Sequence, residues 1–189
     1  MLVSTGGYTE YMESRVLNQK FFERSALKIA PDLLGKYLCR KYGGKVIRRM
    51  ITEVEAYDGF KDKASHAHWG ETPRNKIMFG SPGYWYVYFT YGMHWMLNIV
   101  TGKRGYPAAV LIRGVEGVSG PARVTKFFKV DKKFNEKPAN RKNGLWIEYR
   151  DKKQRTKNNW KIGNSPRVGV NYAGPVWSKK LYRFYIKTL

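Results

Sequence analysis

The sequence is poor in cysteine, in long apolar runs and in acidic residues. Cys39 is the only cysteine among 189 residues, which excludes an internal disulfide. No stretch approaches the roughly 20 apolar residues of a membrane-spanning helix, and no basic amphipathic stretch suits a membrane surface. The first twenty residues lack the apolar core of a secretory signal peptide. From these absences we expect a cytoplasmic protein without a membrane partner.

Basic residues greatly outnumber the acidic ones. Lysine and arginine total 36 against 14 aspartates and glutamates, which gives a formal charge of +22 spread along the whole sequence. Such a charge attracts polyanions at long range, so nucleic acid is the first partner to consider. Aromatic residues make up 15% of the chain, and many alternate with basic ones, which suits base stacking beside phosphate contacts. For most phenylalanines, however, a place in the core is the better explanation.

The chain length fits one compact domain. We expect a polar N-terminal arm over residues 1–20 and a single domain over 21–189, without repeats or linkers. Ser25 is expected to cap a short helix over 25–30, and Pro31 to begin another over 31–36. Gly43-Gly44 adopts positive φ readily and predicts a tight hairpin between strands at 36–42 and 45–57.

A second hairpin is predicted over residues 83–100. It follows a long irregular loop, Asp58 to Gly83, of the kind that is often functional in a small domain. Tyr91 falls at the tip of this hairpin, and an exposed aromatic there, followed by Met93, fits a wedge that enters DNA. A tip folded back onto the domain is the alternative.

The remaining segments complete a mixed fold. Further strands are predicted at 107–117, 144–150, 166–174 and 181–186, a helix after Gly120-Pro121, and an exposed charged loop over 131–144. Together these elements predict a single α+β domain with a mainly antiparallel sheet.

Glu55 is the first candidate for chemistry. A strand period of two places Glu53, Glu55 and Tyr57 on one face, with Val54 and Ala56 on the other. A carboxylate on a strand of a very basic protein can activate water, because neighbouring cations hold it ionised. From the pattern alone, a surface or ion-paired glutamate is the alternative.

Metal and nucleotide motifs are weak or missing. His66 and His68 stand two residues apart, but no cysteine cluster or HExxH pattern accompanies them, so we expect no metal site. There is no Gly-rich phosphate loop and no convincing GxGxxG, which leaves nucleotide hydrolysis and dinucleotide redox chemistry without support. We expect no cofactor.

The motifs together resemble a known family. The segment EVEAYDGFKDKASHAHWGETPRNKIMFGSPGYWYVYFTYGMHWMLNIV resembles the core of the alkyladenine DNA glycosylases, also called methylpurine or 3-methyladenine DNA glycosylases. EAY, TPRN, YVY, YGM and RVGV occur in the family's order, and the likeness covers nearly the whole chain beyond the first twenty residues. The resemblance implies a monomer that needs no metal, with a curved sheet, surrounding helices and a projecting β-hairpin.

The resemblance also implies an active site. Glu55 corresponds to the general base that deprotonates the attacking water, and Arg113 to the arginine that helps hold this water and the base. Tyr57, His66 and Tyr88 correspond to the aromatic pocket for the flipped base. Because water and not a lysine is the nucleophile, we expect a monofunctional glycosylase without lyase activity that leaves an abasic site.

Four further residues are expected to contact the DNA or the base edge. Tyr91 resembles the tyrosine that fills the gap in the duplex, Met93 its neighbour in the minor groove, and Asn98 the asparagine that screens the purine edge. Arg74 of TPRN is our own choice for a phosphate contact. The expected partner is double-stranded DNA with damaged purines, in the cytosol or the nucleoid.

Some residues depart from the family pattern, and two other functions stay open. Trp69, Trp85, His94 and Trp95 are not expected from the family, and residues 103–108 lengthen a loop. A non-catalytic single-strand or RNA-binding protein could use the same aromatics and charge. A metal-dependent nuclease could draw on the acidic residues Glu53, Glu55, Asp58 and Asp62.

Overall fold

The computed structural model describes residues 15–149 and 160–188, and its strands form one curled antiparallel sheet. The order is β3-β4-β5-β2-β1-β7, with β6 beside β5, β9 beside β2 and β8 beside β9. Together with the helices, this sheet confirms the predicted α+β class. The strands are β1 (Tyr37–Tyr42), β2 (Lys45–Asp58), β3 (Trp85–Thr90), β4 (His94–Val100), β5 (Ala108–Val115), β6 (Val118–Ser119), β7 (Leu145–Glu148), β8 (Trp160–Ser165) and β9 (Arg183–Thr188).

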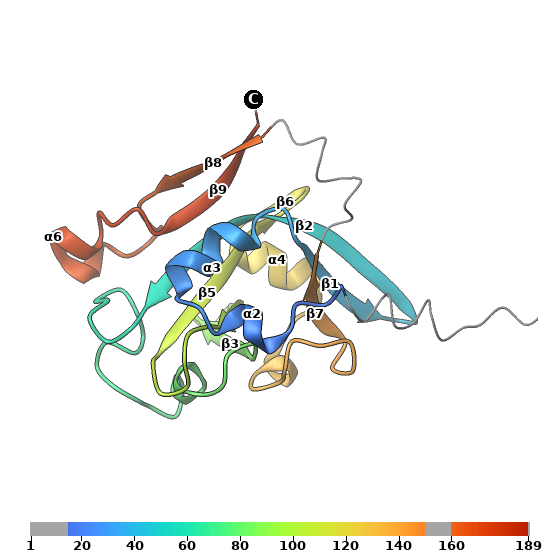
Figure 1. The fold of residues 1–189 in the computed structure, drawn as a ribbon, viewed down its shortest axis with the longest axis horizontal. Coiled ribbons are helices and arrows are strands. Elements are labelled where there is room, and N and C mark those ends of the chain that lie inside the picture. Colours follow the sequence, from blue (N-terminus) through green and yellow to red (C-terminus); the bar gives the residue numbers. More distant parts are fainter. Residues whose placement is uncertain (1–14, 150–159, 189) are drawn as a thin grey trace, which may run out of the picture.

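Short helices pack against the sheet (Figure 1). Buried side chains of α3 and α4 belong to the same apolar cluster as those of β2, β4 and β5. Figure 1 shows β8 and β9 as a separate arm at one edge of the fold, with α6 at its far end. The helices are α2 (Gln19–Phe22), α3 (Ala26–Leu33), α4 (Pro121–Phe127) and α6 (Gly174–Trp177), and the 3-10 turns are η1 (Lys76–Phe79), η2 (Lys132–Phe134) and η3 (Asn171–Ala173).

The long strand β2 joins the two parts of the sheet. Its first half pairs with β1, and its second half pairs with β5 on one side and β9 on the other. The register shifts on both sides of Glu53, as at a β-bulge, where the strand bends. Val54 and Ala56 then face the main core, as the alternation predicts. The opposite face of β2 is thereby free to carry polar side chains.

Both predicted hairpins are confirmed. Gly43 and Gly44 connect β1 to β2 with φ of 56° and 75°. Tyr91 and Gly92 connect β3 to β4, and both have positive φ, as in a type I′ turn. The helix after Gly120-Pro121 is also present as α4, with Pro121 at its first position.

Three predictions of local structure are wrong. Pro31 does not begin a second helix but lies inside α3, which ends at Leu33. The predicted exposed loop at 131–144 contains η2 and buries Phe134 in the main core. Residues 166–174 form turns and η3 instead of a strand, and Gly169 has a φ of 75° that breaks the extended path. Strand β8 was not predicted.

The predicted N-terminal arm is described only in part. Of the predicted arm over residues 1–20, residues 1–14 lie outside the described part, while Leu17 is buried in the main core. Cys39 is fully buried on β1, between β2 and β7. Trp85, a departure from the family pattern, is also buried, and its indole N–H donates to the Leu145 carbonyl.

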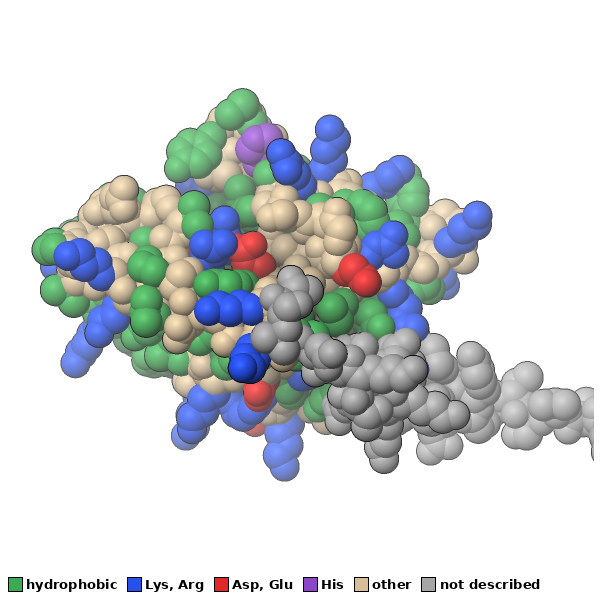
Figure 2. Space-filling view, turned by 90° about the horizontal axis from the view of Figure 1, so that it is seen from above, with side chains coloured by type: hydrophobic (Ala, Val, Ile, Leu, Met, Phe, Trp, Pro, Cys, Tyr) green, Lys and Arg blue, Asp and Glu red, His purple; other side chains and the backbone are tan. Residues whose placement is uncertain are grey.

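The surface carries the charge that the composition predicts. Figure 2 shows Lys and Arg side chains over the whole visible face, with few acidic ones among them. In the described part of the chain, no helix has the length and apolar character to cross a membrane.

Candidate active site

Glu55 lies on β2 where this strand pairs with neighbours on both sides, and its side chain is fully buried. One carboxylate oxygen, Oε1, accepts a hydrogen bond from the backbone N–H of Val168 at 2.8 Å. The other, Oε2, accepts one from the Tyr57 hydroxyl at 2.9 Å. The Arg113 guanidinium lies 3.4 Å from Oε1. The carboxylate is therefore fixed and charge-compensated without any ligand.

These surroundings pull the acidity of Glu55 in two directions. Burial raises its pKa above the usual value, because the ionised form loses water. Arg113, the Val168 N–H, the Tyr57 hydroxyl and Arg167 all lower it. A raised pKa makes a carboxylate a better proton acceptor, and the donors keep it ionised enough to act. Glu55 is ion-paired, but it is not an ordinary surface glutamate.

Glu53 positions the arginine beside Glu55. Its Oε1 accepts hydrogen bonds from Arg113 Nε at 2.9 Å and from Arg183 Nε at 2.7 Å. The Arg113 guanidinium thus uses Nε for Glu53 and turns Nη1 toward Glu55. Glu53 had entered the sequence argument only as a possible metal ligand.

A buried ion pair anchors the segment that supplies Val168. Arg167 donates to Asp62 from Nη1 at 2.5 Å and from Nη2 at 2.8 Å, and both side chains are fully buried. Nη1 also donates to the Ala56 carbonyl at 2.9 Å, and the guanidinium lies 4.8 Å from the centre of the Tyr57 ring. The bidentate pair ties the turn after β8 to the loop that follows β2, and the bond to the Ala56 carbonyl ties it to the strand that carries Glu55.

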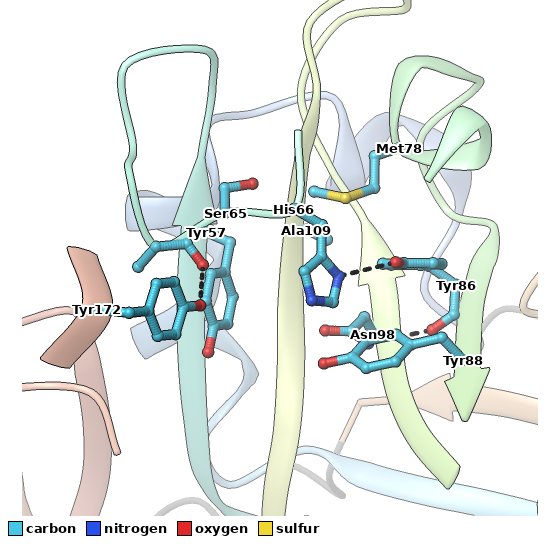
Figure 3. Close-up of a pocket in the computed structure, with 10 residues that line it drawn as sticks. Tyr57, Ser65, His66, Met78, Tyr86, Tyr88, Asn98, Ala109 and Tyr172 are labelled. Atoms are coloured by element: carbon cyan, nitrogen blue, oxygen red, sulfur yellow. Dashed lines mark hydrogen bonds between the residues drawn. The ribbon is translucent and has the colours of Figure 1, made fainter. Parts of the chain in front are cut away.

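The hydrogen-bond partner of Glu55, Tyr57, lines a pocket. Figure 3 shows the residues around this pocket. It encloses about 50 Å³. This exceeds the roughly 10–15 Å³ that one water molecule needs, and it is small for a purine. Its lining combines aromatic, small and polar side chains from β2–β5, the 58–83 loop and η3: Tyr57, Ala64, Ser65, His66, Met78, Tyr86, Tyr88, Asn98, Ala109 and Tyr172.

Aromatic rings form two opposite walls of this pocket. Figure 3 shows Tyr57 and Tyr172 on one side and His66, Tyr86 and Tyr88 on the other. The His66 and Tyr88 ring centres are 4.7 Å apart at 73°, and His66 Nδ1 lies 3.0 Å from the Tyr86 hydroxyl. Tyr172 donates its hydroxyl to the Ala64 carbonyl at 3.0 Å. The pocket therefore lies between two walls of aromatic rings.

The TPRN segment shapes the rim of the pocket. Asn75 is buried, and its amide donates to the carbonyls of His66 and Gly70 at 2.8 and 3.0 Å, which fixes the loop that carries His66. Arg74 donates to the Phe89 carbonyl at 3.1 Å and lies 5.0 Å from the centre of the Tyr88 ring. Burial and this nearby arginine lower the pKa of His66, so its ring stays neutral to lower pH.

Asn98 lies at the inner wall. It is 3% exposed, and its amide Nδ2 donates to the Tyr86 carbonyl across the β3–β4 pair at 3.2 Å. It satisfies a backbone group and lines the pocket at the same time.

The hairpin tip stands away from the pocket. Tyr91 is 85% exposed and Met93 is 67% exposed, so the tip is not folded back onto the domain. A more open hollow of about 630 Å³, which shares Ser65, His66 and Tyr172 with the pocket, connects the pocket to Tyr91. We call it the outer hollow. Trp69, which is 88% exposed, lines it as well.

The structure brings together most of the predicted site residues. Glu55 and Arg113 are in contact, and Tyr57, His66, Tyr88 and Asn98 line one pocket. Arg74 and Tyr91 line the outer hollow, whereas Met93 lies on the other side of the tip.

Other residues of the site were missed. Arg167 and Val168 belong to RVGV, which the sequence shows without indicating any role, and Asp62 had been considered only as a metal ligand. Nothing in the sequence pattern singles out Tyr172.

The acidic residues of the nuclease alternative do not converge on a common point. Glu53 and Glu55 contact arginines, and Asp62 is held by Arg167. Over residues 15–149 and 160–188, no group of at least three His, Cys, Asp or Glu side chains is placed to hold a metal ion.

Comparison with known proteins adds a family to this geometry. The family model described as "Methylpurine-DNA glycosylase (MPG)" matches residues 20–120 and 117–189. A relative from Legionella pneumophila (strain Corby) is 39% identical over 180 residues, which covers 92% of this chain and 95% of the relative. One from Methanocella arvoryzae is 38% identical over 192 residues, covering 91% and 92%. Both relatives carry the name "Putative 3-methyladenine DNA glycosylase".

Proposed function

The chain belongs to the methylpurine-DNA glycosylase family, and we propose that it excises alkylated or deaminated purines from DNA by hydrolysis with a water activated by Glu55. The observation that carries this proposal is a buried, ionisable carboxylate one hydrogen bond away from an aromatic pocket. Family membership supports the coarser statement, a DNA glycosylase for alkylated bases. The geometry supports the assignment of roles.

The chemistry needs few groups. Alkylation at a ring nitrogen makes the purine cationic and therefore a good leaving group, so a general acid is dispensable for such bases. The sugar then develops oxocarbenium character, which a single carboxylate can stabilise while it also removes a proton from water. Glu55 can fill both roles, and Arg113, held by Glu53, keeps its carboxylate in place.

The aromatic walls select and hold the base. A cationic purine between Tyr57 on one side and His66 with Tyr88 on the other gains about 1–2 kcal/mol from cation–π attraction. His66 does not repel it, because the lowered pKa keeps the imidazole neutral. Since the pocket is small for a purine as it stands, we expect its mouth to open when a base is bound. Tyr172, 70% exposed and held there by one hydrogen bond, is the side chain best placed to move.

The hairpin gives access to a paired base. A base inside a duplex must be flipped out before it reaches such a pocket, at a cost of a few kcal/mol. Tyr91 at the exposed tip would fill the vacated place in the stack, with Met93 beside it in the minor groove. The substrate is then double-stranded DNA with damaged purines, bound by a monomer, and Arg74 contacts a phosphate.

The decisive experiment compares base release by wild type and two matched variants. Glu55→Gln keeps the shape of the side chain but cannot take a proton, so release from a duplex with a single lesion should fall at least about 10³-fold while binding persists. Glu116→Gln changes an exposed glutamate in the same way and serves as the control. Wild-type turnover by Glu55→Gln would exclude Glu55 as the base.

Two side measurements separate the alternatives. A single-strand-binding protein would bind undamaged strands and release no base, and a metal-dependent nuclease would lose activity in EDTA and cut the backbone. Borohydride should trap no covalent adduct, because the proposed nucleophile is water.

A further inference from the structure

A basic groove, separate from the pocket and from the outer hollow, lies beside the β3–β4 hairpin. It has a volume of about 480 Å³ and runs between the start of β4 and helix α4. We call it the α4 groove. Its charged and polar lining comes from His94 and Trp95 on β4, from Arg123, Lys126 and Lys129 on and after α4, and from Asp131.

This groove lies on the face of the hairpin opposite the base pocket. Side chains alternate across a two-stranded ribbon, so the hairpin has two faces. Tyr86 and Tyr88 line the pocket, whereas Phe89 and Trp95, which are paired across the strands, lie on the other face with ring centres 4.7 Å apart and ring planes tilted at 48°. The α4 groove includes Trp95 and shares no lining residue with the pocket or the outer hollow.

The groove is positively charged. The Thr125 hydroxyl on α4 lies 2.9 Å from the Trp95 carbonyl and 2.9 Å from the Ala122 carbonyl, so α4 packs directly against the hairpin. Among the residues that the structure describes, no acidic side chain forms a salt bridge with Arg123 or Lys126, and both are exposed. Asp131, the acid in the groove, is 3.2 Å from Lys133 Nζ and so does not cancel this charge.

We propose that the α4 groove binds the phosphodiester backbone of the DNA strand opposite the extrahelical nucleotide. This inference rests on the proposed function. A tip that fills the vacated place in the stack must enter between the two backbones that border the minor groove. The strand with the damaged base then lies on the pocket face of the hairpin. The other strand must pass along the opposite face, where the exposed side chains of Arg123 and Lys126 can contact phosphates.

The two sides of the hairpin face different surroundings. The pocket side is lined by aromatic rings that can receive a base, and on the other side α4 adds cations that can meet sugar and phosphate. Contacts of this kind add affinity regardless of sequence and hold the hairpin in register on the duplex. A single strand offers no opposite backbone, so the groove acts only on duplex DNA.

The test measures binding, so that it does not depend on catalysis. The variant is Arg123→Ala/Lys126→Ala, and the control is Lys20→Ala/Lys28→Ala, which removes the same charge from exposed positions that line none of the three hollows. The probe is a duplex with one stable abasic analogue. Uncharged methylphosphonate linkages replace phosphates near the analogue, either in the lesion strand or in the opposite strand.

The expected result is a coupling with one strand only. Neutral linkages in the opposite strand should weaken wild-type and control binding on the order of ten-fold and the groove variant less than about two-fold, because its phosphate contacts are already gone. The slope of log K against log salt should be shallower by about 1.8 for the groove variant, at about 0.9 per lost contact. Neutral linkages in the lesion strand should weaken all proteins alike.

Equal losses for wild type and groove variant on the opposite-strand probe would overturn the inference, as would coupling to the lesion strand. Thermal unfolding checks the fold of the variant, and the single substitution Lys126→Gln repeats the coupling measurement with a smaller change. A wild-type protein that shows the strand-specific coupling but releases no base from a separate duplex with a damaged purine would contradict the proposed function and not the phosphate contacts of the groove.

Discussion

At the scale of single residues, the neighbours of Glu55 favour the ionised form of a buried carboxylic acid. Burial alone would favour its protonated form, and Arg113 together with donors from Val168 and Tyr57 opposes this. These surroundings therefore set the pKa of Glu55, and each donor lowers it.

Removing Arg113 should move the pH dependence of base release. In Arg113→Met, Glu55 loses a positive neighbour, so its pKa rises further. A general base must be ionised, so activity is lost as pH falls through this pKa. The acidic limb of the kcat profile should therefore shift to higher pH, with recovery at still higher pH. Arg183→Met, which removes a contact to Glu53 but none to Glu55, is the control and should leave the limb in place.

Asn98 should decide between purines. Guanine carries an amine at C2 that adenine and hypoxanthine lack, and a side chain packed there excludes it. Asn98 is buried and tied to Tyr86, so it cannot retreat. Asn98→Ser should raise the ratio of 7-methylguanine to hypoxanthine release by roughly 5- to 100-fold, the equivalent of about 1–3 kcal/mol. An unchanged ratio in a folded variant would show that the selectivity lies elsewhere.

At the scale of structural elements, the turn after β8 depends on a distant partner. Arg167 pairs with Asp62 across 105 positions, and Val168 reaches Glu55 across 113. The hairpins, in contrast, are formed by neighbouring residues. This is why the turn residues Gly43-Gly44 and Tyr91-Gly92, together with the alternation, predicted both hairpins, whereas residues 166–174 were predicted as a strand. Local pattern carries no information about a buried arginine that finds its partner in another loop.

Breaking this long-range pair should cost both stability and activity. Asp62→Ala leaves the Arg167 charge buried and unpaired, which costs about 3–5 kcal/mol in unfolding free energy, and releases the turn that presents Val168 to Glu55. Asp32→Ala removes an exposed partner of Arg24 and should cost less than about 1 kcal/mol. Urea denaturation of both variants measures the difference. Similar small losses would show that the buried pair does not hold the turn.

Elements at the pocket were partly predictable for the same reason. The alternation along β2 placed Glu55 and Tyr57 on one face. The motif resemblance added His66, Asn98 and Arg113. Tyr172 comes from η3, which the sequence assigned to a strand, and its place opposite His66 follows only from the folded chain.

At the scale of the whole molecule, a charge of +22 acts on DNA before any specific contact forms. Affinity for undamaged duplex should fall steeply with salt, because each phosphate contact releases counterions. Between about 50 and 200 mM salt we expect a loss of at least about 100-fold, measured by equilibrium binding. A flat dependence over this range would remove electrostatics as the source of general affinity.

The buried thiol of Cys39 can be used to measure how often the sheet opens. It lies between β2 and β7, and burial raises its pKa, so in the folded state it offers little of the reactive thiolate. A thiol reagent can modify Cys39 only when the sheet opens around β1, so the modification rate measures this opening. Because the chain has one cysteine, Met93→Cys would add the sole readily labelled position. A fluorophore attached at position 93 would lie on the tip that we propose enters the duplex, while the buried Cys39 stays unlabelled.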